Sequence, residues 1–143
     1  MARTVDVAEY ILASRGEMTA MKLQKLAYYS KAWHLVWEGK SLFPDDIEAW
    51  ANGPVVRSLY DMHKGMFVVV PGVFGGDATQ LSIDEVSSVD AVLGFYGDYT
   101  PFDLSEQTHR EAPWRAARAG LQPGERGDSV ITEASMAEYY ESL

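Results

Sequence analysis

The histidines are the side chains in this sequence best suited to metal binding or proton transfer near neutral pH. There are three of them, His34, His63 and His109, and the chain has no cysteine. A zinc site needs several His, Cys or carboxylate ligands at short range, and no two of these histidines are four residues apart. His34 and His63 fall on apolar helix faces, where we expect a buried or half-buried ring with one hydrogen bond. The sequence therefore predicts no metal site.

Nucleophilic catalysis needs a serine, threonine or cysteine beside a general base. The chain has no Gly-x-Ser-x-Gly, and its glycine-rich segment Gly72–Gly76 lacks the Gly-Lys-Ser/Thr ending of a phosphate-binding loop. The acidic pairs Asp45-Asp46 and Asp84-Glu85 could serve acid–base or Mg²⁺ chemistry. The first lies in a predicted loop, however, and the second in a helix capping box. We predict no catalytic residue and no cofactor, and we expect a binding protein rather than an enzyme.

His109 differs from the other histidines because it lies where one short helix is expected to end and another to begin, near Trp114. An imidazole there either caps the helix ends or faces a partner.

Lys22 and Lys25 occupy the first turns of another predicted helix, where the helix dipole disfavours positive charge. They are not placed to stabilise that helix. Two explanations remain open for them, chance placement on a solvated turn and a surface role in binding.

The helix that carries these lysines is expected to form the centre of the domain, over about residues 19–38. Thr19 can cap its start, and Gly39 follows its end. From Leu26 onward the predicted helix is apolar on nearly every side, which is typical of a helix buried inside a domain.

Other helices and two short strands are expected to surround this one. Asn52-Gly53-Pro54 is predicted to begin a helix, with the proline at its first position. Asp103 and Glu106 are expected to cap another. The predicted helices are Thr4–Arg15, Pro54 to Gly65, Ser82 to Tyr96, Asp103 to Thr108 or His109, Trp114–Ala119 and Thr132–Tyr140; the predicted strands are Ile47–Trp50 and Met66–Val70. The fold class is therefore mainly α (α+β), one domain over residues 1–143 with a two- or three-stranded β element.

Composition and charge narrow the choice of partner. The chain of 143 residues is 47% hydrophobic, and its longest apolar run is five residues, so we expect a protein of the cytoplasm with no membrane partner. Residues 1–65 carry eight acids and eight bases, whereas residues 66–143 carry thirteen acids and four bases. The net charge of −9 disfavours nucleic acid. It either attracts a basic protein partner or only keeps the protein soluble.

Several sequence runs, with their spacing, resemble the Panacea domain family, which includes phage-associated proteins and antitoxins of the SocA type. The runs are Lys22-Leu23-Gln24-Lys25-Leu26-Ala27-Tyr28-Tyr29, Trp33-His34-Leu35, Leu42-Phe43, Ile47-Glu48-Ala49-Trp50, Gly53-Pro54-Val55-Val56, Leu59-Tyr60, Leu104-Ser105-Glu106, Thr108-His109 and Glu111-Ala112-Pro113-Trp114. The resemblance implies an antitoxin that neutralises a cognate toxin by direct contact between the two proteins. Some members of the family act instead as adaptors that deliver the toxin to an ATP-dependent protease.

The family has no established catalytic residues to carry over to this chain. The candidate partner-binding residues are therefore chosen for their chemistry. They are Lys22, Lys25, Trp50, Asn52, Gly53, Tyr60, His109, Glu111 and Trp114. Aromatic residues supply affinity in protein interfaces, whereas charge mainly sets the association rate and the choice of partner. An uncharacterised enzyme or a small-molecule-binding protein remains the alternative from a different class.

Overall fold

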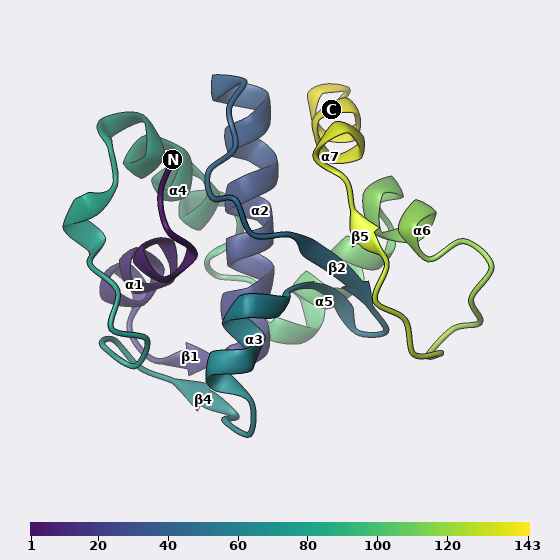
Figure 1. Ribbon diagram of the computed structural model, residues 1–143, viewed down its shortest axis with the longest axis horizontal. Helices are drawn as coiled ribbons and strands as arrows, with labels where there is room; N and C mark the ends of the chain where they lie inside the picture. The colour runs from purple at the N-terminus through teal and green to yellow at the C-terminus, as the bar shows by residue number, and fades with distance from the viewer.

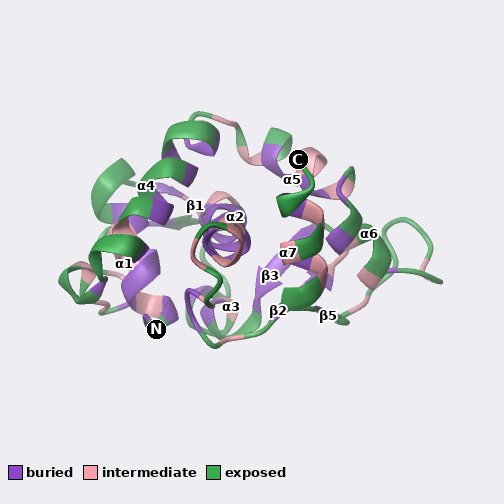
Figure 2. Cartoon of the chain, turned by 90° about the horizontal axis from the view of Figure 1, so that it is seen from above, coloured by how far each residue is buried: buried purple, intermediate pink, exposed green.

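A long helix, α2 (Ala20–Glu38), passes through the middle of the molecule (Figure 1). The computed structural model describes all 143 residues. Viewed from above, α2 lies at the centre, with α1 (Thr4–Arg15) and α4 (Ile83–Tyr96) on one side and α7 (Glu133–Glu141) on the other (Figure 2). Most residues of α2 are buried, and one hydrophobic core joins them to the surrounding elements. The prediction of a central buried helix is confirmed.

The predicted caps of α2 are present. The hydroxyl of Thr19 accepts a hydrogen bond from the amide of Lys22 at 3.1 Å, and Gly39 follows the helix in the left-handed conformation. Ser82 and Glu85 form the predicted capping box at the start of α4. The prediction for α5 (Pro101–His109) was wrong at its start, because the hydroxyl of Thr100, three residues before Asp103, caps this helix.

A three-stranded antiparallel sheet lies beside the N-terminal half of α2. Its strands are β2 (Ile47–Trp50), β3 (Gly53–Val56) and β5 (Val130–Ile131), in the order β3-β2-β5. Strands β2 and β3 form a hairpin in which Trp50 pairs with Gly53 and Ile47 pairs with Val56. A second sheet pairs β1 (Met18–Thr19) with β4 (Val68–Val69), so the predicted strand Met66–Val70 is confirmed over two residues.

The prediction that Gly53-Pro54 begins a helix was wrong. These residues form β3, and the helix that follows, α3 (Arg57–His63), starts three residues after Pro54. Gly53 has φ of +127°, which is outside the helical region and which a residue with a side chain adopts only under strain. Pro54 is tolerated because β3 is an edge strand, where one side of the backbone has no strand to pair with.

The remaining helix, α6 (Ala112–Ala117), and the 3-10 turn η1 (Ala78–Gln80) complete the chain. Helix α6 begins two residues before the predicted start and ends two residues before the predicted end. None of the helices combines the length and the apolar character that crossing a membrane requires.

A buried carboxylate joins α2, α7 and the junction between α5 and α6. Glu111 is buried, and its Oε1 accepts hydrogen bonds from the hydroxyls of Tyr29 at 2.8 Å and Tyr140 at 2.7 Å. Its Oε2 accepts a hydrogen bond from Gln107 Nε2 at 3.1 Å. Burial raises the pKa of Tyr29 and of Tyr140, and the charge of Glu111 adds to both shifts, so these phenols stay protonated and donate.

We expect Glu111→Ala to lower the free energy of unfolding by about 2–4 kcal/mol, because two buried hydroxyls lose their charged acceptor. Urea denaturation followed by circular dichroism measures this. Glu106→Ala is the matched control, since Glu106 lies on α5, is partly exposed and makes no side-chain hydrogen bond or ion pair; we expect it to stay within about 0.5 kcal/mol of the wild type. Equal effects of the two changes would contradict this role for Glu111.

Candidate functional site

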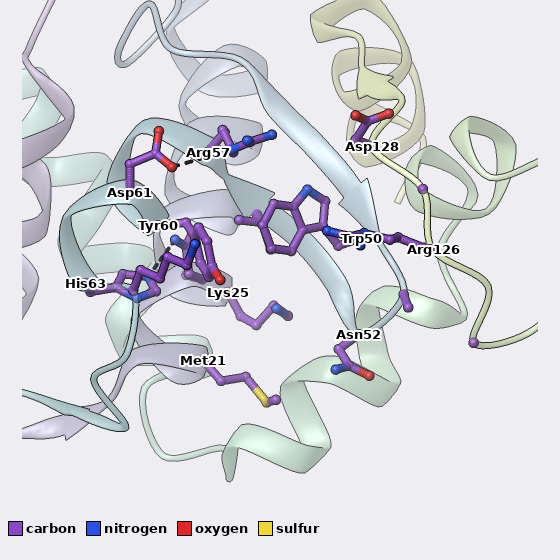
Figure 3. A pocket seen from close by; sticks show the side chains of 16 residues that line it. Met21, Lys25, Trp50, Asn52, Arg57, Tyr60, Asp61, His63, Arg126 and Asp128 are labelled. Carbon is purple, nitrogen blue, oxygen red and sulfur yellow. Dashed lines mark hydrogen bonds and ion pairs between the residues drawn. The ribbon is translucent and has the colours of Figure 1, made fainter.

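Four of the nine predicted binding residues line one pocket of about 780 Å³, beside the N-terminal half of α2 (Figure 3). They are Lys25, Trp50, Asn52 and Tyr60. The walls come from α2, the β2–β3 hairpin, α3 and the segment before β5. The other lining residues are Met21, Gln24, Ala51, Val55, Arg57, Asp61, His63, Lys64, Gly124, Arg126, Gly127 and Asp128.

Lys25 lines this pocket and is buried. Only 2% of the residue is exposed, and its Nζ donates one hydrogen bond, to the carbonyl oxygen of Pro54 at 3.2 Å. An ammonium group has three N–H donors, and no carboxylate lies within 4.0 Å of this one. Burial lowers the pKa of Lys25 to about 8. The solvated-turn explanation for Lys25 was therefore wrong, because β3 packs over this side of α2.

Gly53 makes room for the lysine. A Cβ at residue 53 would lie 2.5 Å from Lys25 Cε and 3.1 Å from Thr108 Oγ1, both closer than real Cβ atoms normally come. Its φ of +127° also favours glycine at this position. Gly53 is itself buried, so its role in the structure is to let the hairpin approach the lysine closely.

Neighbouring Gln24 fixes the other end of β3 to α2. Its Oε1 accepts a hydrogen bond from the amide of Val56 at 2.8 Å, and its Nε2 lies 3.2 Å from the carbonyl oxygen of Val56 and 2.9 Å from His63 Nε2. Burial lowers the pKa of His63, and the charge of Lys25 adds to that shift, so its ring is neutral at pH 7. Gln24 and Lys25 together satisfy backbone groups on the edge of β3 that faces no other strand.

Two aromatic rings line one side of the pocket, Trp50 from the hairpin and Tyr60 from α3. The rings of Trp50 and Tyr60 meet edge to face, with centroids 4.7 Å apart, and both residues are partly exposed. The indole of Trp50 donates to Glu48 Oε1 at 2.8 Å. In Figure 3 the amine end of Lys25 lies between Tyr60 and Asn52, with Trp50 above it.

The pocket is locally basic although the protein is acidic overall. Its lining holds four cationic side chains, Lys25, Arg57, Lys64 and Arg126, and two carboxylates, Asp61 and Asp128. Arg57 is paired, with Asp61 at 3.5 Å and with Glu48 at 3.6 Å. The other three cations make no ion pair.

The segment that carries Arg126 and Asp128 is tied to the sheet by the buried Arg118. This guanidinium donates to the carbonyl oxygens of Ala49, at 3.0 Å, and Glu125. No sequence pattern indicates that this segment meets α3 and the hairpin, because it is a Gly/Pro-containing loop far from them in the chain. The apolar periodicity of α3 predicts which face of the helix is buried, but it does not predict that Arg57, Asp61 and Lys64 face the pocket.

The predicted residues of the α5–α6 junction lie behind the hairpin. His109 and Trp114 stack with ring centroids 4.1 Å apart, and the Trp114 indole donates to the carbonyl oxygen of Trp50 at 2.9 Å. Burial lowers the pKa of His109, so its ring is neutral at pH 7. These two residues support Trp50 from behind. Glu111 is an interior residue, as described above.

The two remaining candidates for a functional role, Lys22 and His34, lie outside the pocket. Lys22 is partly exposed but does not line the pocket. His34 is buried, and its Nδ1 lies 2.7 Å from Ser88 Oγ, as expected for a structural histidine. No three His, Cys, Asp or Glu side chains come close enough together to hold a metal ion.

Comparison with known families identifies the segment that builds most of this pocket. Residues 23–69 match the family model described as antitoxin SocA-like, Panacea domain. The resemblance predicted from the sequence is confirmed over this stretch. The matched Panacea segment contains Gln24, Lys25, the hairpin and α3, whereas the runs from Leu104 to Trp114 lie outside it. The comparisons with curated proteins and with solved structures find no match to the chain.

We expect Lys25→Met to raise the free energy of unfolding at pH 7, by less than the roughly 3 kcal/mol that the lowered pKa of Lys25 corresponds to, because the buried carbonyl of Pro54 loses its hydrogen bond. Methionine has a similar length and removes a buried charge whose lowered pKa reports its desolvation cost. Thermal and urea denaturation measure the change. Lys22→Met is the matched control on the same helix, and a loss of stability in Lys25→Met at pH 7 would contradict the prediction.

We also expect the difference in stability between the wild type and Lys25→Met to depend on pH. The pKa of Lys25 is about 8 in the folded protein and about 10.5 when unfolded, so its penalty is fully present below pH 8. Between pH 8 and 10.5 the unfolded chain binds more protons, and the stability of the wild type should rise toward that of Lys25→Met. Denaturation of both proteins at pH 7, 8, 9 and 10 measures the difference. A difference that stays constant over this range would contradict the lowered pKa.

Proposed function

We propose that this protein is an antitoxin that neutralises a cognate protein toxin by direct contact. The Panacea match carries this proposal, because the matched residues 23–69 form most of the lining of the pocket. The partly exposed Trp50 and Tyr60 at its wall are of the residue types that most often dominate binding energy in protein interfaces. The proposed contact surface is the rim of this pocket, including Asn52.

The rest of the chain supports the same reading. One hydrophobic core joins elements before, within and after the matched stretch, so we propose that residues 1–143 form a single Panacea-like domain. The net charge of −9 would speed association with a basic toxin. The protein would act in the cytoplasm of a bacterium, from a bacterial or phage gene, and it would work by binding rather than by catalysis.

The antitoxin proposal predicts a small toxin-like reading frame beside this gene, and the first test is co-expression with it under a separately inducible promoter. We expect growth to stop when the neighbour is induced alone and to recover when both are made. Simple occlusion leaves the toxin intact, so its amount on an immunoblot should not fall. Persistent growth arrest would contradict the antitoxin function, and shortened toxin half-life would contradict occlusion in favour of delivery to a protease.

Trp50→Ala tests the contact surface. We expect at least a 30-fold loss of toxin affinity by titration calorimetry, because removing a central aromatic anchor costs about 2 kcal/mol or more. Trp37→Ala is the matched control, since Trp37 lies on α2 outside the pocket and is 46% exposed. Thermal denaturation of both variants checks that they fold. Similar affinities for the two variants would exclude this face as the toxin-binding surface.

A further inference from the structure

The buried lysine of the pocket has a charge and hydrogen-bond donors that nothing in the protein satisfies. Lys25 Nζ bonds to one backbone carbonyl, and two of its three N–H groups have no acceptor. Burying an ammonium group without an acidic partner is unfavourable, and a hydrophobic residue of similar size would fill the space. The pocket keeps the charge, and Gly53 leaves the space that the lysine needs.

The charges around Lys25 determine which kind of ligand group could pair with its ammonium group. Lys64 and Arg126 add two unpaired positive charges to the lining, which favours an anion. Asp61 is paired with Arg57, so Asp128 is the one carboxylate of the lining without an ion pair, and the lining keeps a net positive charge that suits an anionic group. On a protein partner, the anionic side chains are the carboxylates of Asp and Glu. The volume of about 780 Å³ is ample for one side chain with its flanking backbone.

We propose that the pocket binds a carboxylate presented by the partner protein, an Asp or Glu side chain, with Lys25 as its ion-pair partner. This inference rests on the proposed function, since it takes the toxin as the source of the carboxylate. Lys64 and Arg126 would attract the acidic residue, and the edge-to-face pair Trp50–Tyr60 would pack against its flanking chain. The site would be a local exception to the general attraction between an acidic antitoxin and a basic toxin.

The buried ammonium group of Lys25 is unfavourable in the free protein, and an ion pair with a bound carboxylate would stabilise it. An opposite charge at hydrogen-bond distance favours the protonated amine, and a hydrogen bond between charged groups is worth about 1.5–3 kcal/mol. The carboxylate would also supply the acceptors that Lys25 lacks. Lys25 would then discriminate between partners, because a toxin without an acid at this position would leave the amine buried and unpaired.

Direct binding to the free protein tests the chemistry without a toxin. The probe is N-acetyl-L-glutamate α-amide, which has one carboxylate, and its neutral match is N-acetyl-L-glutamine α-amide. Each is titrated into the full chain while NMR follows the indole N–H of Trp50 and the side-chain Hε–Cε signals of Lys25. We expect the glutamate probe to shift both signals in a saturable way and to bind at least 10-fold more tightly than the glutamine probe. Equal binding of the two probes, or no shift, would overturn the proposal.

Variants and a second anion sharpen the test. We expect Lys25→Met to weaken the glutamate probe at least 10-fold, Arg126→Gln to weaken it a few-fold, and Lys22→Met to leave it unchanged. Lys25→Met is expected to fold, and its thermal denaturation verifies this. Inorganic phosphate is titrated in parallel. Tighter binding of phosphate than of the glutamate probe, or unchanged probe binding by Lys25→Met, would overturn the carboxylate assignment.

The toxin experiment separates this inference from the proposed function. If the wild type neutralises the toxin and Lys25→Met does not, the ion pair with the toxin is supported. If both neutralise it equally, the inference fails while the antitoxin function stands. If the wild type neutralises no toxin, the proposed function and the toxin as source of the carboxylate both fail, and the probe titration still decides whether the pocket prefers a carboxylate.

Discussion

The site depends on the way helix α2 holds the edge of strand β3. An edge strand leaves backbone groups without a partner, and here two adjacent side chains of α2 supply partners for them. The Gln24 amide bonds to both backbone groups of Val56, and Lys25 donates to Pro54. These bonds fix the hairpin against the central helix. The positions of Trp50 and Asn52 depend on these bonds, because both residues lie at the turn end of the hairpin.

The attachment explains why a charged residue occupies an interior position. A neutral amide such as Gln24 satisfies a strand edge without adding charge, so hydrogen bonding to Pro54 alone does not require an ammonium group. The structure keeps the ammonium at a cost in stability, and it keeps a glycine at residue 53 to accommodate it. Proteins commonly retain unfavourable features of this kind where they bind or react. A buried lysine without an acidic partner is therefore the strongest sign that this pocket acts on something outside the chain.

The candidate partner-binding residues were chosen by their chemistry, and in the folded chain some of them line the pocket whereas others have structural roles. Glu111 is an interior acceptor for two tyrosines, and His109 with Trp114 supports the back of the hairpin. Of the nine candidates, only Lys25, Trp50, Asn52 and Tyr60 line the pocket. The net charge and the basic lining act at different distances. The negative charge of the whole protein governs long-range attraction to a partner, whereas the cations of the lining determine which group binds at contact.

The sequence by itself determined the central helix, its caps at Thr19 and Gly39, the capping box at Ser82 and the resemblance to the Panacea domain, because these depend on local periodicity and on residues close in the chain. Only the tertiary structure decided that Gly53-Pro54 is a strand and that Lys25 is buried. Both depend on packing between α2 and the hairpin, which local propensity does not describe. The segment Gly124–Asp128 completes the pocket from a distant part of the chain, through Arg118, and no pattern near Lys25 could have revealed it.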